Sequence, residues 1–433
     1  MEKTLDKFSK KLIKAGLGRE HGHSEPLMGG LDDCVIWNRK AEETDVLEKV
    51  FQGLYINSLA FLRPTEPYSG ILSFLADRAL NSNGIISPGI ILPGDCETRT
   101  FLHDLPVIPE FDPDQIIQVL KKRKSVIVAD QNNGRGADWT EGVCPAIISH
   151  STVSPEQAYV TISSVCFAAF VKFFSNYLED LQKGTADDRA HELFDAVSSH
   201  LQPIQEKMPN LMQAPFKTEE SVYSAIIEAG LKTVEYGLVD SYFGNASCLW
   251  NHVLYISQTG SSLDELAGCI DPVPLNGSTS AGLTASSELS AHIEALSRTG
   301  ATTILHGHPK FSVIMSMNCE PKEKANCRFS GQFSDQALDQ ALDRASSQCH
   351  IKCPKKRYIG NIPIVPGEVG TGPFGLCNTL PPALENSNQA IVYGHGLFTV
   401  GKKDFTDAFE SLLKAEETCR NIYLNKVREL QKS

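Results

Sequence analysis

A helix followed by a strand is the clearest pattern of apolar and polar positions in this sequence, and it lies within residues 284–308. Leu289, Ile293 and Leu296 recur at the spacing of one helix face. Residues 302–305 are apolar or β-branched, which favours a strand. The stretch therefore predicts an amphipathic helix and a buried strand.

Two histidines follow directly on the predicted strand. Side chains two residues apart on a strand point to the same side, so we expect His306 and His308 to aim their imidazoles at one point. Two imidazoles beside a carboxylate make an incomplete metal site, which needs a third ligand. His395 is the candidate, because it follows a second apolar strand over 390–393 and is flanked by glycines that let the backbone turn sharply. A lone histidine on a strand is usually a core residue, but three at two strand ends favour a metal site.

Polar residues around the predicted helix are candidates for catalysis and anion binding. Glu288 is expected in the first turn, where it is either an acid/base group or a carboxylate that interacts with the helix dipole. The helix start and two upstream polar turns can offer backbone N–H groups to a phosphate. The candidate phosphate contacts are Gly244, Asn245, Thr259, Gly260, Ser286 and Ser287. The two serines also suit the N-cap of the helix.

Helix and strand patterns alternate over residues 45–181, as they do in α/β domains. A long helical segment over 155–181 closes this region, and the polar stretch 182–191 is typical of a linker edge. We therefore predict two domains, an N-terminal α/β domain over residues 1–190 and a metal-binding domain over residues 210–433.

The order of elements in the N-terminal region matches that of the C-terminal region in outline, which favours a degenerate copy of one fold. In this alignment His150 lies opposite His395, and Leu62, Arg63, Pro64 and Thr65 occupy the stretch of the His306–His308 pair. One imidazole without companions does not hold zinc, so no ion is expected there. The alternative is an unrelated α/β domain.

Composition restricts the class of protein. The chain has 433 residues, 41% of them hydrophobic and 21% charged, as in ordinary globular proteins. Its formal net charge of −12 argues against a nucleic-acid binder. No apolar run approaches the roughly 20 residues that span a bilayer, and the first helix lacks the apolar core of a signal peptide. We expect a cytoplasmic protein without membrane contact.

The sequence contains 12 cysteines, and four of them gather in an insertion between the predicted strands of the metal domain. These four are Cys319, Cys327, Cys349 and Cys353. Their number indicates a candidate second metal site, either structural zinc or iron–sulfur. Their spacing has no C-x-x-C pair, so free thiols that lie near one another are the alternative.

Taken together, the pieces in this order resemble the class II aldolase/adducin family, which includes fuculose-phosphate aldolase. The order is Gly-Asn (244–245), Thr-Gly (259–260), Ser-Ser-Glu (286–288), His-x-His (306–308) and His395-Gly. The resemblance covers about residues 220–430. It implies an α/β/α layered fold with a central, mainly antiparallel sheet.

The resemblance also implies a divalent metal, usually zinc, on His306, His308 and His395, with Glu288 as the acid/base. The substrate would be a small sugar phosphate, held at the six candidate phosphate contacts. The implied reaction is an aldol cleavage or condensation, in which the metal stabilises an enediolate. Relatives form homo-oligomers and take a tyrosine from a neighbouring subunit, for which Tyr358 and Tyr393 are candidates.

Three alternatives remain open on the same scaffold. A sugar-phosphate 4-epimerase uses the same retro-aldol step, but relatives of that type carry Asp where Glu288 stands. A dehydratase or decarboxylase would use the same metal. An adducin-like interaction protein would have no chemistry, but such relatives typically lack the histidines.

Overall fold

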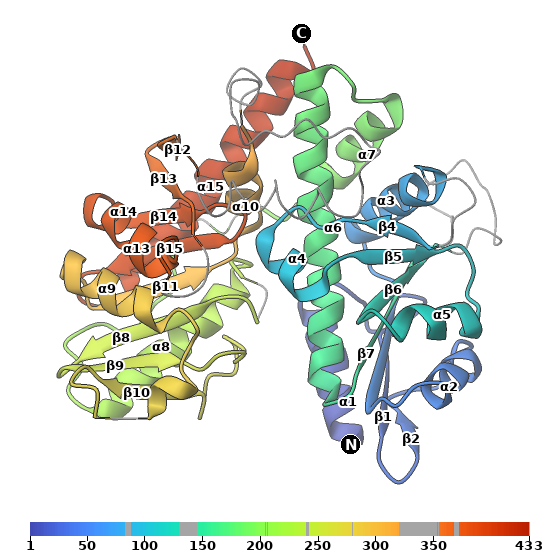
Figure 1. Ribbon diagram of the computed structural model, residues 1–433, viewed down its shortest axis with the longest axis horizontal. Helices are drawn as coiled ribbons and strands as arrows, with labels where there is room; N and C mark the ends of the chain where they lie inside the picture. The colour runs from blue at the N-terminus through green and yellow to red at the C-terminus, as the bar shows by residue number, and fades with distance from the viewer. Residues whose placement is uncertain are drawn as a thin grey trace. The chain divides into compact units, whose positions relative to one another are not determined.

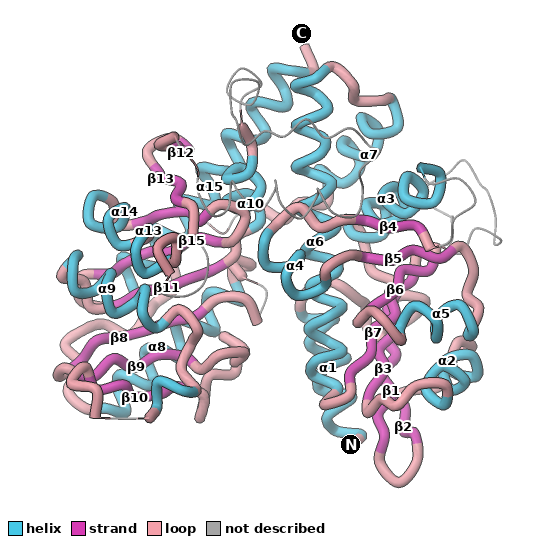
Figure 2. The backbone as a smooth tube through the Cα atoms, viewed as in Figure 1, coloured by secondary structure: helices cyan, strands magenta, loops and turns pink. Residues whose placement is uncertain are grey.

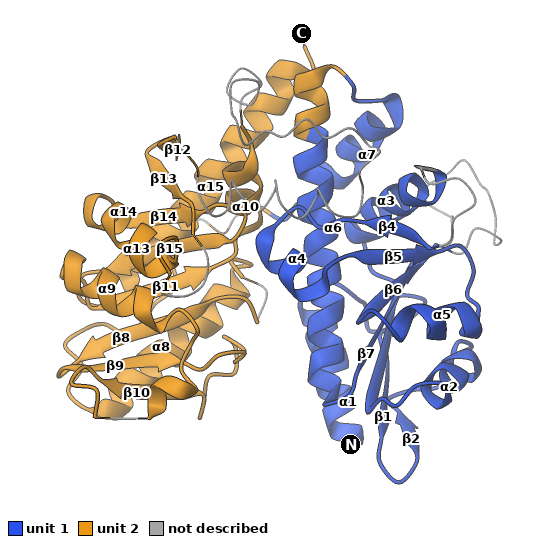
Figure 3. Ribbon diagram, in the orientation of Figure 1, with its two compact units in different colours: residues 1–177, 185–202 blue, residues 178–184, 203–433 orange. Residues whose placement is uncertain are grey.

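The computed structural model describes residues 1–82, 88–129, 145–203, 205, 207–239, 242–278, 280–319, 353, 355–367 and 372–432. These residues form two compact units, each an α/β arrangement around one β-sheet (Figures 1, 2 and 3). The N-terminal unit comprises residues 1–177 and 185–202, and the C-terminal unit comprises residues 178–184 and 203–433.

The N-terminal unit is built on a sheet whose described strands have the order β2-β1-β3-β7-β6-β5-β4. Its strands are β1 (Leu27–Leu31), β2 (Val35–Trp37), β3 (Ser58–Leu62), β4 (Gly89–Ile91), β5 (Leu105–Ile108), β6 (Ser125–Val128) and β7 (Ala146–Ser151). Its helices are α1 (Glu2–Lys14), α2 (Thr44–Gln52), α3 (Tyr68–Ser82), α4 (Cys96–Leu102), α5 (Pro113–Leu120), α6 (Pro155–Lys183, whose last turns from residue 178 belong to the C-terminal unit) and α7 (Asp188–Ser199). Helices α2 and α5 cover one face, where Leu47 and Ile116 join the strand residues of an apolar core.

Helix α6 is the longest element of this unit. By length and composition α6 is long and apolar enough to span a membrane, which the sequence pattern had not indicated. Most of its apolar stretch is buried inside the structure. Its rings Phe170 and Phe173 pack against Tyr68 and Phe74 of α3. Packing within the unit therefore accounts for its apolar composition.

The C-terminal unit contains a second sheet, with the described strand order β10-β9-β8-β11-β15-β14-β13-β12. Its strands are β8 (Asn245–Trp250), β9 (Val253–Ser257), β10 (Ile270–Pro274), β11 (Thr303–Gly307), β12 (Arg357–Ile359), β13 (Ile362–Val365), β14 (Gln389–Val392) and β15 (Gly396–Gly401). Its helices are α8 (Glu219–Glu235), α9 (Leu289–Thr299), α10 (Lys310–Met317), α13 (Leu376–Thr379), α14 (Pro381–Asn386) and α15 (Phe405–Leu430), with a 3₁₀ turn η1 (Ala281–Leu283). The described pairs are antiparallel except β13 with β14, so the sheet is mainly antiparallel as predicted.

Helices lie on both faces of this sheet. Helices α9, α13 and α14 cover one face, and Ala295, Leu380 and Leu384 pack there on Ile304 and Phe398 of the central strands. Helix α15 packs along β15 and β11, while α8 packs along β8 and α10 along β14. The layered α/β/α fold predicted from the sequence is confirmed.

The two sheets have the same topology. If β10 is set aside, the order β2-β1-β3-β7-β6-β5-β4 corresponds strand by strand to β9-β8-β11-β15-β14-β13-β12. Strand directions agree as well, because β5 and β6 are parallel, as are β13 and β14, whereas the other described pairs in both sheets are antiparallel. The fold predicted for a degenerate copy is therefore present in the N-terminal unit.

The alignment drawn from the sequence is wrong in detail. It placed His150 opposite His395, but β7, which carries His150, corresponds to β15, and β6 corresponds to β14. His150 Nε2 instead lies 3.0 Å from the Leu120 carbonyl oxygen. Similar apolar strands cannot be distinguished by composition, and their hydrogen-bonded neighbours decide the match.

The start of α9 also differs from the prediction. The helix begins at Leu289, and its N-cap residue is Glu288 rather than Ser286 or Ser287. Ser286 lies two residues earlier, and its Oγ accepts a hydrogen bond from Glu288 N. Glu288 therefore stands at the boundary of the helix, where its side chain is free to turn toward the end of β11.

Candidate metal centre

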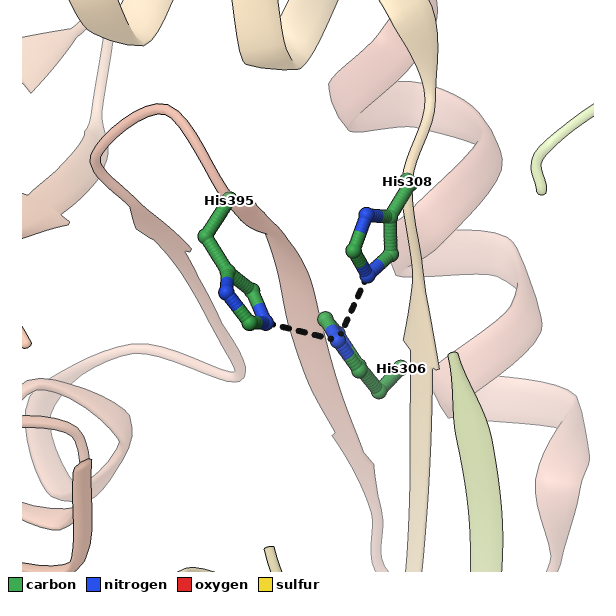
Figure 4. A group of neighbouring side chains, drawn as sticks. All are labelled: His306, His308 and His395. Carbon is green, nitrogen blue, oxygen red and sulfur yellow. Dashed lines mark hydrogen bonds between the residues drawn. The ribbon is translucent and has the colours of Figure 1, made fainter. Parts of the chain in front are cut away.

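The structure brings together the three histidines predicted as metal ligands (Figure 4). His306 is on β11, His308 follows its last residue, and His395 lies in the turn between β14 and β15. His306 Nε2 lies 3.0 Å from His308 Nε2 and 3.3 Å from His395 Nε2. All three side chains are at most 4% exposed. Among the described residues, they are the one set of His, Cys, Asp or Glu side chains gathered closely enough to hold an ion.

The geometry of these nitrogens fits a divalent ion. A tetrahedral zinc with Zn–N bonds of about 2.0–2.1 Å separates its ligand nitrogens by about 3.3 Å, close to the distances that involve His306 Nε2. His306 Nδ1 lies 3.1 Å from the Leu397 carbonyl oxygen and donates to it, so Nε2 carries the lone pair. Three converging ring nitrogens with a buried carboxylate beside them are the donor set that zinc prefers.

Glu288 is held beside the histidines by Asn245. Its Oε1 lies 3.1 Å from His395 Nε2, and its Oε2 lies 3.7 Å from His306 Nε2. Asn245 Nδ2 donates to Oε2 at 2.6 Å and also reaches Ser286 Oγ at 3.2 Å. The carboxylate is 4% exposed. Its position is therefore set by a side chain of β8 as well as by the start of α9.

Burial and charge act in opposite directions on this carboxyl. Burial raises the pKa of Glu288, but the imidazoles of His306 and His395 and the hydrogen bond from Asn245 outweigh it and hold the pKa well below its ordinary value. Burial together with the neighbouring imidazoles lowers the pKa of His308 well below its ordinary value. Both shifts favour an anionic Glu288 beside a neutral His308, the protonation states that a bound cation requires.

Backbone and aromatic contacts fix the rings. The His306 ring stacks on Phe398 at 3.7 Å between centroids, and Phe243 stacks on His308 at 5.4 Å. Gly244 has a φ of 107°, and a Cβ on it would lie 2.4 Å from the His306 carbonyl oxygen. Gly244 is therefore needed for close approach to β11, whatever its part in phosphate binding.

The residues predicted to bind phosphate lie on adjacent loops. Thr259 N donates to Thr284 O, and its Oγ1 donates to Ala285 O. Ser286 is buried, whereas Ser287, Thr259 and Gly260 are exposed. The loop that carries Thr259 and Gly260 is thus hydrogen-bonded to the segment that leads into Glu288. Ser287, Thr259 and Gly260 face solvent on these two segments.

Two further buried groups near the centre were not singled out from the sequence. His292 lies one turn after Glu288 on α9, and its Nδ1 is 2.7 Å from Ser247 Oγ. Burial lowers the pKa of His292 to about 4, although the Glu288 charge opposes this. Glu416 of α15 accepts hydrogen bonds at 2.8 Å from the backbone N–H groups of Phe311 and Ser312, and so caps α10 directly after His308-Pro309. Acidic or polar residues on an apolar helix face are the sequence signal for such groups.

The predicted cysteine site lies partly outside the described residues. Cys327 and Cys349 are not described, whereas Cys319 and Cys353 are half-buried and not in disulfides. Of the candidate tyrosines, Tyr358 is 57% exposed on β12, and the Tyr393 ring lies 5.5 Å from the Arg357 guanidinium.

Comparison with known proteins gives a family match within this domain. Residues 224–423 match the sequence model of the family described as "Class II Aldolase and Adducin N-terminal domain". No curated protein matches the chain. Solved structures that resemble it include three aldolases. L-fuculose-1-phosphate aldolase from Thermus thermophilus is 22% identical, covers 47% of this chain and 94% of its own, and has a TM-score of 0.35.

The other two are more distant. A sugar-phosphate aldolase from Thermotoga maritima is 16% identical and covers 47% of this chain and 95% of its own, with a TM-score of 0.32. L-fuculose 1-phosphate aldolase from Glaciozyma antarctica is 15% identical and covers 49% of this chain and 78% of its own, also with a TM-score of 0.32.

The fold and the histidine cluster define an α/β domain with a candidate metal site. Residues 224–423 of this domain match the model of the class II aldolases and adducins. The resemblance drawn from the sequence is thus confirmed for the C-terminal half of the chain.

Proposed function

We propose that this protein is a metal-dependent aldolase that cleaves or forms a C–C bond in a small, phosphorylated hydroxycarbonyl compound. The observation that carries the proposal is the convergence of three buried imidazole nitrogens beside the Glu288 carboxylate. The family match supports it, because the matched stretch contains all four residues. An interaction protein without catalytic activity has no need of such a buried polar cluster. Burying these groups costs desolvation free energy unless they pair or hold an ion.

In this proposal His306, His308 and His395 hold the divalent ion, with zinc as the expected metal. When bound, the ion supplies a Lewis acid that polarises the oxygens of a carbonyl substrate. The histidines fix its position because β11 and the β14–β15 turn are parts of one hydrogen-bonded sheet. The rings are buried, so bulk water is excluded from all but the substrate side.

Glu288 is the proposed acid/base. In the cleavage direction a substrate hydroxyl gives its proton to a tyrosine phenolate, its C–O bond becomes a carbonyl, and the electron pair of the broken C–C bond stays on the adjacent carbon. Glu288, after it takes up a proton from water, delivers that proton to the carbon, and in the condensation direction the Glu288 carboxylate removes it again. Asn245 orients the carboxylate through Oε2, which leaves Oε1 facing the histidines.

Substrate phosphate is proposed to bind at the loops that carry Gly244-Asn245, Thr259-Gly260 and Ser286-Ser287. The exposed residues of this set, Ser287, Thr259 and Gly260, lie on the segments paired beside Glu288. We further propose a cytoplasmic homo-oligomer whose proton donor to the aldehyde oxygen is a tyrosine.

The test combines metal analysis with a retro-aldol screen. Purified full-length protein should contain one divalent ion per chain, and His306→Ala should lose it while its circular dichroism stays unchanged. His23→Ala, at an exposed position in the N-terminal unit, is the matched control and should keep the ion. Full metal occupancy in His306→Ala would exclude the ligand assignment.

The screen measures aldehyde release from phosphorylated ketoses, with the metal-free protein as the blank. Release that depends on the metal supports the aldolase. Epimer formation without release of aldehyde would indicate the epimerase instead. If the metal-loaded protein converted none of these compounds, an interaction protein would be favoured.

A further inference from the structure

The shared topology of the two sheets lets each metal-site residue be matched to a position in the N-terminal unit by hydrogen-bond register. His306 pairs with Asn245 on one side and Phe398 on the other. Phe61 of β3 pairs in the same way with Leu27 on β1 and Ile148 on β7. Phe61 therefore stands at the position of His306. Two residues later, Arg63 stands at the position of His308, one residue away from the alignment drawn from the sequence.

The N-terminal unit also has a carboxylate at the position that corresponds to Glu288. Glu43 is the N-cap residue of α2, as Glu288 is of α9, and each helix leads directly to the central strand of its sheet. In sequence Glu43 and Arg63 are 20 residues apart, which is also the separation of Glu288 and His308. Both carboxylates point back to the end of that strand. Glu43 forms an ion pair with Arg63, and Glu288 lies beside His306.

The matched positions have different chemistry in the two units. Phe61 and Leu27 are fully buried in the apolar core, where the C-terminal unit has His306 and Asn245. The Phe61 ring packs against Phe111 at 5.7 Å and lies 5.0 Å from the Arg63 guanidinium. The Arg63 and Glu43 side chains are only 15% and 17% exposed. The N-terminal unit thus keeps a cation beside a carboxylate, but the cation is the Arg63 side chain instead of a metal ion.

We propose that the N-terminal unit is a metal-independent copy of the C-terminal fold, in which the Arg63 guanidinium replaces the metal ion as the cation that pairs with the carboxylate at the helix start. Arginine suits this role because it stays charged, binds carboxylates in a fixed geometry and stacks on aromatic rings. Its half-buried pair with Glu43 joins the end of β3 to the start of α2. The metal cluster joins the corresponding elements, β11 and α9.

Two consequences distinguish this proposal from an ordinary ion pair. The chain should bind one ion, not two, and removal of the ion should leave the N-terminal unit unchanged. In addition, Phe61→His with Arg63→His should recreate a metal site, because two imidazoles and Glu43 form the His₂Glu ligand set known for zinc.

The first experiment is a Co²⁺ titration followed by visible absorption, carried out on the full chain with His306→Ala to remove the resident site. Addition of Phe61→His and Arg63→His should restore about one Co²⁺ per chain, with d–d bands of tetrahedral coordination. The matched control adds Glu43→Gln to the same variant, and should weaken Co²⁺ binding at least tenfold. A folded variant that binds no Co²⁺ would overturn the equivalence of the positions.

The second experiment needs no new site and covers the case in which the histidine variant does not fold. Hydrogen exchange is measured in β3 and α2 for Glu43→Gln, Arg63→Gln and the double variant. The pair should show a coupling of at least tenfold in the opening equilibrium, about 1.4 kcal/mol. Chelation of the metal should change exchange in β11 and α9 but not in β3 and α2. Additive effects of the two substitutions, or metal-dependent exchange in β3, would refute the proposal.

Discussion

Gly396→Ala tests how the β14–β15 hairpin positions the histidine cluster. A Cβ on Gly396 would lie 2.6 Å from the Gly307 carbonyl oxygen and 2.7 Å from His306 Cε1. Carbon atoms in good contact are about 3.5–4.0 Å apart. The His306 ring must therefore move by about 0.8 Å, or β15 must separate from β11. Because Gly307 O is a backbone atom in the same strand, neither adjustment leaves His306 in place.

The displacement can be compared with what a metal site tolerates. Ligand distances in metal sites stay within about 0.2 Å of their preferred values, so a shift of this size breaks the arrangement of the three nitrogens. Disturbing the groups that orient metal ligands typically costs about 10–100-fold in affinity. We expect Gly396→Ala to fall in this range, with about 1–3 kcal/mol of lost stability from overpacking.

The assay is competition for Zn²⁺ with a chromogenic chelator, using wild-type and variant full-length protein. Gly372→Ala is the matched control, because an added Cβ there meets nothing within 4 Å. If Gly396→Ala bound zinc as tightly as Gly372→Ala, the close approach would not be what positions His306.

Three further predictions concern buried carboxyls. Glu288→Gln should keep the metal but lose about 10²-fold or more in retro-aldol rate, since an amide cannot exchange the proton; an unchanged rate would leave Glu288 as a helix-start carboxylate only. Asp95 caps α4, and burial raises its pKa to about 6, so the native state binds this proton more tightly than the unfolded state and stability falls as pH rises from about 4 to 6. Asp95→Asn should remove a slope worth about 3 kcal/mol, measured as unfolding midpoints across that range, and parallel curves would contradict it. Glu416→Gln leaves one acceptor oxygen for the N–H groups of Phe311 and Ser312, so hydrogen exchange at the start of α10 should rise by the equivalent of about 1–3 kcal/mol; unchanged exchange would show that the cap is dispensable.

The histidine cluster could be predicted from the sequence because its signal is local. The alternation of β11 alone places His306 and His308 on one side, and the glycines around His395 mark a turn. The contact of Asn245 with Glu288 joins residues 43 apart in the sequence, and no periodic pattern of residues indicates it. Glu416 likewise acts on α10 from a position 105 residues away. Such contacts depend on which elements pack together, which only the fold determines.

The register of the strands was the other feature that the sequence alone could not determine. The sequence alignment of the two halves was displaced by one residue at β3 and by one whole strand at β7. An apolar run such as 58–62 offers little to distinguish neighbouring registers, whereas the hydrogen-bonded partners Leu27 and Ile148 fix it. The one-residue correction matters, because it moves Arg63 from the place of Gly307 to the place of His308.

The chain leaves β11 through α10 and returns to the sheet at β12, and the side chain of Arg357 joins these two points. Arg357 Nη2 donates to the carbonyl oxygen of Asn318, the C-cap residue of α10, at 2.6 Å. The same guanidinium lies over the ring of Tyr393 in the turn that carries His395. The Arg357 guanidinium therefore ties the end of α10 and the start of β12 to the turn that carries His395.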